Sequence, residues 1–145
     1  MRKAVTLLLV MLLGLSLVLC GCGAQKEPES LEYNTVYPLS TAEYRMAVNH
    51  KLVPVISQLQ PLVRAENLSN ENVSDVLDSV SEACERLAGM NPPKDKVSYH
   101  ADLLANLDAV IRHLQYADGQ IDEQPTIAFA DAVQNLENAF QVSVN

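Results

Sequence analysis

The chain contains no tryptophan and only two phenylalanines among its 145 residues. With so few large aromatic side chains, the interior of a folded domain has to be filled by leucine, valine, isoleucine and alanine. We therefore predict an aliphatic core that stabilises the domain by itself.

Basic residues are also scarce, with ten lysines and arginines against 18 aspartates and glutamates. Two of the ten, Arg2 and Lys3, stand at the N-terminus, and the other eight leave the rest of the chain with a net charge near −10. An acidic body repels the phosphates of nucleic acids and anionic lipid headgroups. The composition therefore disfavours nucleic-acid binding and direct binding to a membrane surface, and solubility is the simplest reason for the acidity.

The chain has too few cysteines for a disulfide framework. Of its three cysteines, Cys20 and Cys22 lie near the N-terminus, which leaves Cys84 as the single cysteine of the remaining chain. An isolated cysteine on the apolar face of a helix behaves as a small hydrophobic side chain. We predict that Cys84 is buried and unreactive, and a redox-active or partner-linking thiol is the alternative.

Sequence patterns that bind metals or haem are missing as well. No glutamate is followed three residues later by a histidine, and no Cys-x-x-Cys-His motif is present. His100 and His113 face apart on a helix because thirteen residues correspond to about 220° around its axis, and His50 belongs to another segment. We predict no metal and no cofactor, with His100 at the core edge bonded to a backbone or carboxylate group. The alternative is a haem that His100 and Met46 or Met90 bind.

The N-terminal segment has the layout of a secretory signal. Arg2 and Lys3 are followed by 16 uncharged, mostly apolar residues from Ala4 to Leu19. A short basic region before an apolar stretch is typical of a signal peptide. The stretch is shorter than the roughly 20 residues that a permanent transmembrane helix needs. We therefore predict a targeting segment here.

A cysteine motif closes this segment, in the order Leu19-Cys20-Gly21-Cys22. An apolar residue three positions before a cysteine and a small residue directly before it resemble the lipobox of bacterial lipoproteins. The resemblance implies that residues 1–21 are removed and that Cys22 carries a lipid. This lipid attaches the protein to the extracytoplasmic face of a cell membrane, or to the outer membrane of a cell with two membranes. Cys20 fits less well because Leu19 precedes it, and ordinary signal cleavage or an uncleaved anchor are the alternatives.

Beyond Cys22 the chain divides into a tether and a folded domain. Residues 23–30 are small and polar, which is typical of a disordered segment. Residues 31–37 contain a leucine, a valine and two tyrosines and are too apolar for a free linker. We predict that residues 22–39 form the lipidated cysteine, a flexible tether and an extended arm, and that residues 40–145 form one domain.

Four amphipathic segments fill the predicted domain, at about 41–66, 70–88, 93–117 and 125–142. Each has apolar residues at spacings of four and three, the period of an α-helix. Their stripes are Val48, Leu52, Val55, Leu59 and Leu62; Val73, Leu77, Val80, Cys84 and Leu87; His100, Leu104, Leu107, Ile111 and Leu114, flanked by Leu103 and Val110; and Phe129, Val133, Leu136 and Phe140. Because the loops are short, we predict an all-α fold, an up-and-down antiparallel four-helix bundle.

The first segment carries a helix-start signal and two prolines. Ser40 and Glu43 are spaced as a capping box, in which each side chain accepts a hydrogen bond from the other residue's backbone. Pro54 and Pro61 lie inside the apolar stripe, although a proline costs a straight helix about 3 kcal/mol. Because the stripe continues through both, we predict one helix that is kinked at the prolines. The bend serves packing alone or opens a ligand cavity beside this helix.

The sequence contains no recognisable catalytic set of side chains. Pro92-Pro93 followed by a helix that carries His100 resembles a pattern of small helical bacterial lipoproteins, and that resemblance implies no activity. We predict a non-enzymatic binding module at the cell envelope, attached to the membrane through Cys22, with a transporter, sensor or wall enzyme as its protein partner. The alternative is a carrier or sensor of a small ligand or metal, with its cavity beside the kinked helix.

Overall fold

The computed structural model describes residues 37–65, 68 and 73–145, so the predicted signal, Cys22 and most of the predicted tether and arm lie outside the described residues. In this part of the chain the structure gives bounds for four α-helices and one short 3₁₀ helix, and it contains no strand. The helices are α2 (Thr41–Val63), α3 (Ser74–Ala88), η2 (Lys94–Lys96), α4 (Val97–Ala117) and α5 (Phe129–Val144). The predicted all-α class with four α-helices is confirmed.

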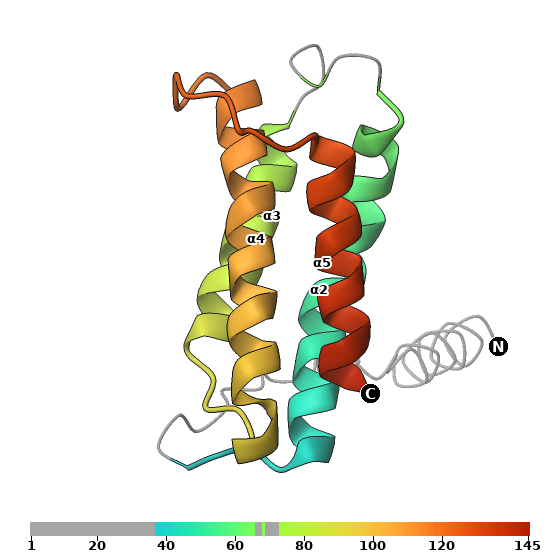
Figure 1. The fold of residues 1–145 in the computed structure, drawn as a ribbon, viewed down its shortest axis with the longest axis vertical. Coiled ribbons are helices and arrows are strands. Elements are labelled where there is room, and N and C mark those ends of the chain that lie inside the picture. The colour runs from blue at the N-terminus through green and yellow to red at the C-terminus, as the bar shows by residue number, and fades with distance from the viewer. Residues whose placement is uncertain (1–36, 66–67, 69–72) are drawn as a thin grey trace, which may run out of the picture. The chain divides into compact units, whose positions relative to one another are not determined.

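The four α-helices lie side by side around one core (Figure 1). The helix α2 packs against α3 and α5, and α4 packs against the same two helices. The Gln60 side-chain amide also donates a hydrogen bond to the Glu137 carboxylate, which joins α2 to α5. The largest fully buried side chains are one tyrosine, leucines and valines: Tyr44, Leu52, Leu59, Leu87, Leu103, Leu107, Leu114, Leu136, Val48, Val73, Val80 and Val110. The predicted aliphatic core is therefore confirmed.

The start of α2 is fixed by the capping box that the sequence predicts. The Glu43 carboxylate accepts a hydrogen bond from the Ser40 backbone at 2.9 Å, and the Glu43 backbone donates to the Ser40 hydroxyl at 3.3 Å. Just before the helix, the Leu39 amide donates to the Asn91 carbonyl at 2.9 Å. The chain is thereby tied to the segment between α3 and η2 before it enters α2.

One helix runs through both prolines, as predicted. Pro54 and Pro61 lie inside α2, and both are exposed. Each proline leaves the carbonyl four residues earlier without its helical donor. Val55, Leu59 and Leu62 nevertheless stay buried, so the apolar face continues past the first proline and on either side of the second.

Three helix boundaries differ from the predicted ones. The first helix ends at Val63 instead of residue 66. The third begins at Val97 instead of residue 93, because Pro93 is extended (ψ 149°) and its carbonyl accepts the Lys96 amide at 2.8 Å in a tight 3₁₀ turn. The fourth begins at Phe129 instead of residue 125, because Ala128 still has extended backbone (ψ 149°). The second begins at Ser74, and residues 69–72, where we expected its start, lie outside the described residues.

A glycine follows the end of α4 and closes the helix. Gly119 has φ 74°, a left-handed conformation that favours glycine. The Gln120 amide donates to the Gln115 carbonyl at 2.8 Å and the Gly119 amide to the Tyr116 carbonyl at 3.2 Å. These two bonds form a Schellman motif, which satisfies the last carbonyls of the helix.

The inward face of α4 is centred differently from the predicted stripe. Leu103 and Val110 are fully buried, whereas Leu104 and Ile111 are only partly buried. The reason is that α4 packs against both α3 and α5, so its apolar face is wide and its centre is set by both neighbours.

In the described part of the chain, none of the helices has both the length and the hydropathy of a membrane span.

Candidate functional site

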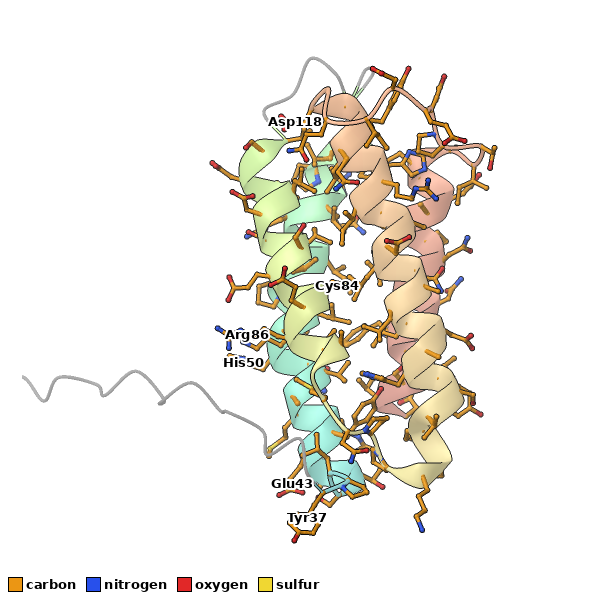
Figure 2. The ribbon with its side chains drawn as sticks, turned by 90° about the vertical axis from the view of Figure 1, so that its left-hand side faces the viewer. Tyr37, Glu43, His50, Cys84, Arg86 and Asp118 are labelled. Atoms are coloured by element: carbon orange, nitrogen blue, oxygen red, sulfur yellow. The ribbon has the colours of Figure 1, made fainter. Side chains whose placement is uncertain are left out.

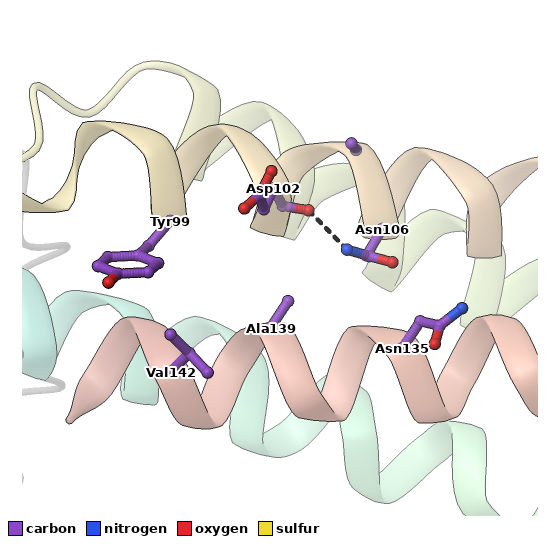
Figure 3. A pocket seen from close by; sticks show the side chains of 7 residues that line it. Tyr99, Asp102, Asn106, Asn135, Ala139 and Val142 are labelled. Atoms are coloured by element: carbon purple, nitrogen blue, oxygen red, sulfur yellow. Dashed lines mark hydrogen bonds between the residues drawn. The ribbon is translucent and has the colours of Figure 1, made fainter.

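A groove runs between α4 and α5 (Figure 3). It has a volume of about 350 Å³ and is lined by Tyr99, Asp102, Ala105, Asn106, Asn135, Ala139 and Val142. Tyr99 and Val142 face one another at one end, and they are 41% and 48% exposed. Asn135 and Asn106 stand further along the groove. The groove therefore has an apolar end and an amide-rich end, and Asp102 is the one charged residue among those that line it.

Two interactions orient the side chains of this groove. The Asn106 side-chain amide donates a hydrogen bond to the Asp102 backbone carbonyl at 2.8 Å. The Lys96 ammonium group lies 5.4 Å from the centre of the Tyr99 ring, within cation–π distance. The ammonium group of this nearly buried lysine therefore lies over the aromatic ring at the apolar end.

Two further hollows lie at the C-terminal end of α4. One of about 240 Å³ is lined by Ala109, Arg112, His113 and the loop residues Glu123, Gln124, Pro125, Thr126 and Ile127. The other, about 620 Å³, is lined by Asp108, Arg112, Gln115, Gln120, Ile121, Asp122 and Glu123. The two hollows share Arg112 and Glu123. Neither these hollows nor the groove is lined by any residue of α2.

His113 is a buried histidine at the first of these hollows. Its side chain is 8% exposed, its ring packs edge-on against Phe129 with centroids 5.7 Å apart, and its Nε2 atom has no hydrogen-bond partner. Leaving a buried polar group unpaired costs about 1–3 kcal/mol. Burial also lowers the pKa of His113, so the ring is neutral at pH 7.

A polar cluster of Tyr44, His100 and Ser143 lies near the other end of the domain. The Tyr44 hydroxyl and the His100 Nδ1 atom are 3.2 Å apart, and the Ser143 hydroxyl donates to the Ala139 carbonyl at 2.8 Å. All three clustered side chains are buried. His100 is therefore a core-edge histidine as predicted, but its partner is a tyrosine hydroxyl where we expected a backbone or carboxylate group.

The pKa of His100 is also lowered, chiefly because burial penalises the charged ring. The Leu87 carbonyl opposes this shift, although it does not form a hydrogen bond with the ring, and the Nε2 atom stays unpaired. Burial likewise raises the pKa of Tyr44, while the Ser143 hydroxyl opposes that shift. Both groups are held in their neutral forms, which suits a structural cluster between α2, α4 and α5.

Acidification is expected to destabilise the fold through these two histidines. Their pKa values are lowered in the folded state, so below the unfolded value of about 6.5 the unfolded chain binds protons more readily. Their contribution is complete above pH 6.5 and is lost as the pH falls, by at most about 1.4 kcal/mol per histidine and pH unit. Urea unfolding at pH 7.5 and 5.5 measures the loss. The variant His113→Phe should reduce the pH dependence of the free energy of unfolding. The control His50→Gln, at an exposed position, should leave it unchanged. The reverse result would contradict the role given to His113.

Cys84 lies on α3 beside α4 (Figure 2), where it is partly buried. Burial raises the pKa of its thiol, and the negative charges of Asp108 and Glu85 raise it further. Because the thiolate is the reactive form, a raised pKa makes the thiol unreactive at neutral pH. These surroundings favour the structural interpretation of Cys84 over the redox one.

The described residues do not bring the histidines together with other ligands. Over this part of the chain, no group of three or more histidine, cysteine, aspartate and glutamate side chains is placed to hold a metal ion. Met46, one of the two methionines considered as a haem ligand, is exposed on α2, and Met90 is buried.

The sequence pattern also missed the hollow beside His113, because its second wall comes from loop residues that have no periodic signal.

Comparison of the chain with protein-family models, with curated proteins and with solved structures gives no match.

Proposed function

We propose that this protein is a lipid-anchored, non-enzymatic binding module on the extracytoplasmic face of a cell membrane, with its lipid on Cys22. Its domain is an up-and-down antiparallel four-helix bundle whose first helix is kinked at Pro54 and Pro61. The lipid provides the membrane contact, which the acidic body does not favour. The function of the domain is to bind a protein of the cell envelope.

The groove between α4 and α5 carries this proposal. Protein-binding sites concentrate their binding energy in a few aromatic and aliphatic side chains surrounded by polar groups. Tyr99 and Val142 supply the exposed apolar pair, and the side chains of Asn106 and Asn135 supply polar groups beside it. Of the three hollows described above, this is the one whose lining includes an exposed aromatic side chain beside an exposed aliphatic one.

The small residues that line the groove favour a helical segment of the partner. The groove is also lined by the small side chains of Ala105 and Ala139, which let another backbone approach α4 and α5 closely. Apolar residues on one face of such a helix would contact Tyr99 and Val142. A lysine or arginine one turn away would pair with Asp102. The partner is therefore an amphipathic helix with a basic residue beside its apolar stripe.

The alternative function, a small-ligand or metal carrier with a cavity beside the first helix, gains no specific support. The groove and both hollows are lined by α4, α5 and the loop between them, and no residue of α2 takes part. We therefore do not advance it as a second function of the α2 face.

Site-specific photo-crosslinking of the membrane-anchored protein tests the groove. A photoreactive residue in place of Ala105, in the groove, is expected to form a discrete adduct with an envelope protein. The same residue in place of Ser57, exposed on α2, is the matched control and should form no such adduct. Mass spectrometry of the adducts identifies the crosslinked segment, which should be an amphipathic helix.

The double variant Tyr99→Ala, Val142→Ser gives the decisive comparison. Removing an anchor of an interface commonly costs about 2 kcal/mol or more, so the adduct should fall by at least about tenfold. Both side chains are well exposed, so the fold should persist, which circular dichroism verifies. Equal adducts from the Ala105 and Ser57 positions, or an unchanged adduct in the double variant, would contradict the proposed docking surface.

A further inference from the structure

The smaller hollow at the C-terminal end of α4 is separate from the α4–α5 groove. One wall consists of Ala109, Arg112 and His113 on α4, and the other is the loop from Glu123 to Ile127. Its volume of about 240 Å³ lies just below the range of about 300–1,000 Å³ that is usual for ligand sites. A molecule that fills it is about the size of a single amino acid.

His113 gives this hollow a feature that packing alone does not explain. The side chain borders the hollow and is more than nine-tenths buried, and its Nε2 atom has no hydrogen-bond partner in the protein. Buried polar groups in folded proteins are nearly always paired. Because the Nε2 atom itself is buried, a ligand in the hollow would contact it only after the ring turns toward the hollow.

The charges on the two walls are opposite and unpaired with each other. Arg112 extends from α4 and Glu123 from the loop, both are exposed, and no ion pair joins them. The rest of the lining combines three apolar residues, Ala109, Pro125 and Ile127, with three polar ones, His113, Gln124 and Thr126. A site with one cationic group, one anionic group and an apolar wall matches a small zwitterion that has an apolar side chain.

We propose that this hollow binds a free α-amino acid with an apolar side chain. The carboxylate of the ligand pairs with Arg112, whose guanidinium group suits two-point contact with a carboxylate. Its ammonium group pairs with Glu123, and its side chain lies against Pro125 and Ile127. A simple carboxylic acid or a simple amine would leave one of the two protein charges without a partner. This activity is independent of the docking groove and extends the proposed function to ligand sensing.

Isothermal titration calorimetry of the full-length protein in detergent tests the site with leucine, valine and phenylalanine as probes. At least one of these amino acids should bind saturably with one site per chain. Isocaproate and isoamylamine resemble leucine but lack its ammonium group and its carboxylate, respectively. Each analogue should bind at least about tenfold more weakly than leucine, because one charge-assisted contact is lost.

Variants separate this site from nonspecific binding. Arg112→Ala and Glu123→Gln should each weaken binding of the amino acid by at least about tenfold. Arg86→Ala, which removes an exposed arginine from α3, is the matched control and should leave binding unchanged. No saturable binding of any of the three amino acids overturns the proposal. Equal binding of either analogue, or equal effects of Arg112→Ala and Arg86→Ala, overturns it as well.

Discussion

Replacing Cys22 with serine is expected to remove the lipid from the protein completely. In the proposed function Cys22 is the single acylated residue, and serine has no thiol to which a lipid can be attached. Since one acyl chain alone binds membranes only weakly and reversibly, the proposed attachment requires the full lipid group on this residue. The variant should either leave the membrane fraction or accumulate as a precursor that retains residues 1–21.

Intact-mass spectrometry of the fractionated protein distinguishes these outcomes from a failed prediction. The natural protein should carry the mass of the attached lipid and lack residues 1–21, and the Cys22→Ser variant should lack any lipid mass. Cys20→Ser and Cys84→Ser are matched controls that should remain lipidated. An unchanged mass and fractionation pattern in Cys22→Ser would show that the lipobox interpretation is wrong.

Leu52→Ala is expected to lower the free energy of unfolding by about 2–5 kcal/mol. Leu52 is fully buried on α2, so its truncation removes apolar contacts and leaves a cavity in a tightly packed aliphatic core. Small domains have total stabilities of about 5–15 kcal/mol, so the variant should lose a large share of it. Urea unfolding followed by far-ultraviolet circular dichroism measures the difference.

The adjacent position provides the control for this core substitution. Val53 is 50% exposed, and Val53→Ala should change the free energy of unfolding by no more than about 0.5 kcal/mol. Because Pro54 follows immediately, this pair tests the orientation of α2 at the first proline. Similar effects of Leu52→Ala and Val53→Ala would mean that α2 does not present this face to the core.

Local signals in the sequence predict much of the fold. The capping box of Ser40 and Glu43 is correct to the residue, because it depends on contacts within a single turn. The stripe of α2 is also correct, and it continues through two prolines because burial outweighs their local cost. Gly119 ends α4 because glycine readily adopts the left-handed backbone conformation found at this position.

Features that depend on neighbouring helices could not be predicted in this way. The sequence pattern places Leu103 and Val110 at the flank of the α4 stripe, whereas both are fully buried because two helices cover α4. The partner of His100 comes from Tyr44, 56 residues away in sequence. The hollow beside His113 could not be predicted because its second wall is an irregular loop. The sequence has only a glycine and a proline as signals for the path of this loop.

The hydrogen bond between Leu39 and Asn91 has a mechanical consequence. A force applied to the chain ahead of α2 acts first on this hydrogen bond and then on the helix. The capping box at Ser40 resists the same force. Because Asn91 belongs to the segment that follows α3, the force is divided between two helices instead of peeling the first turn of one. A protein held by its N-terminal end would thus resist unravelling from that end.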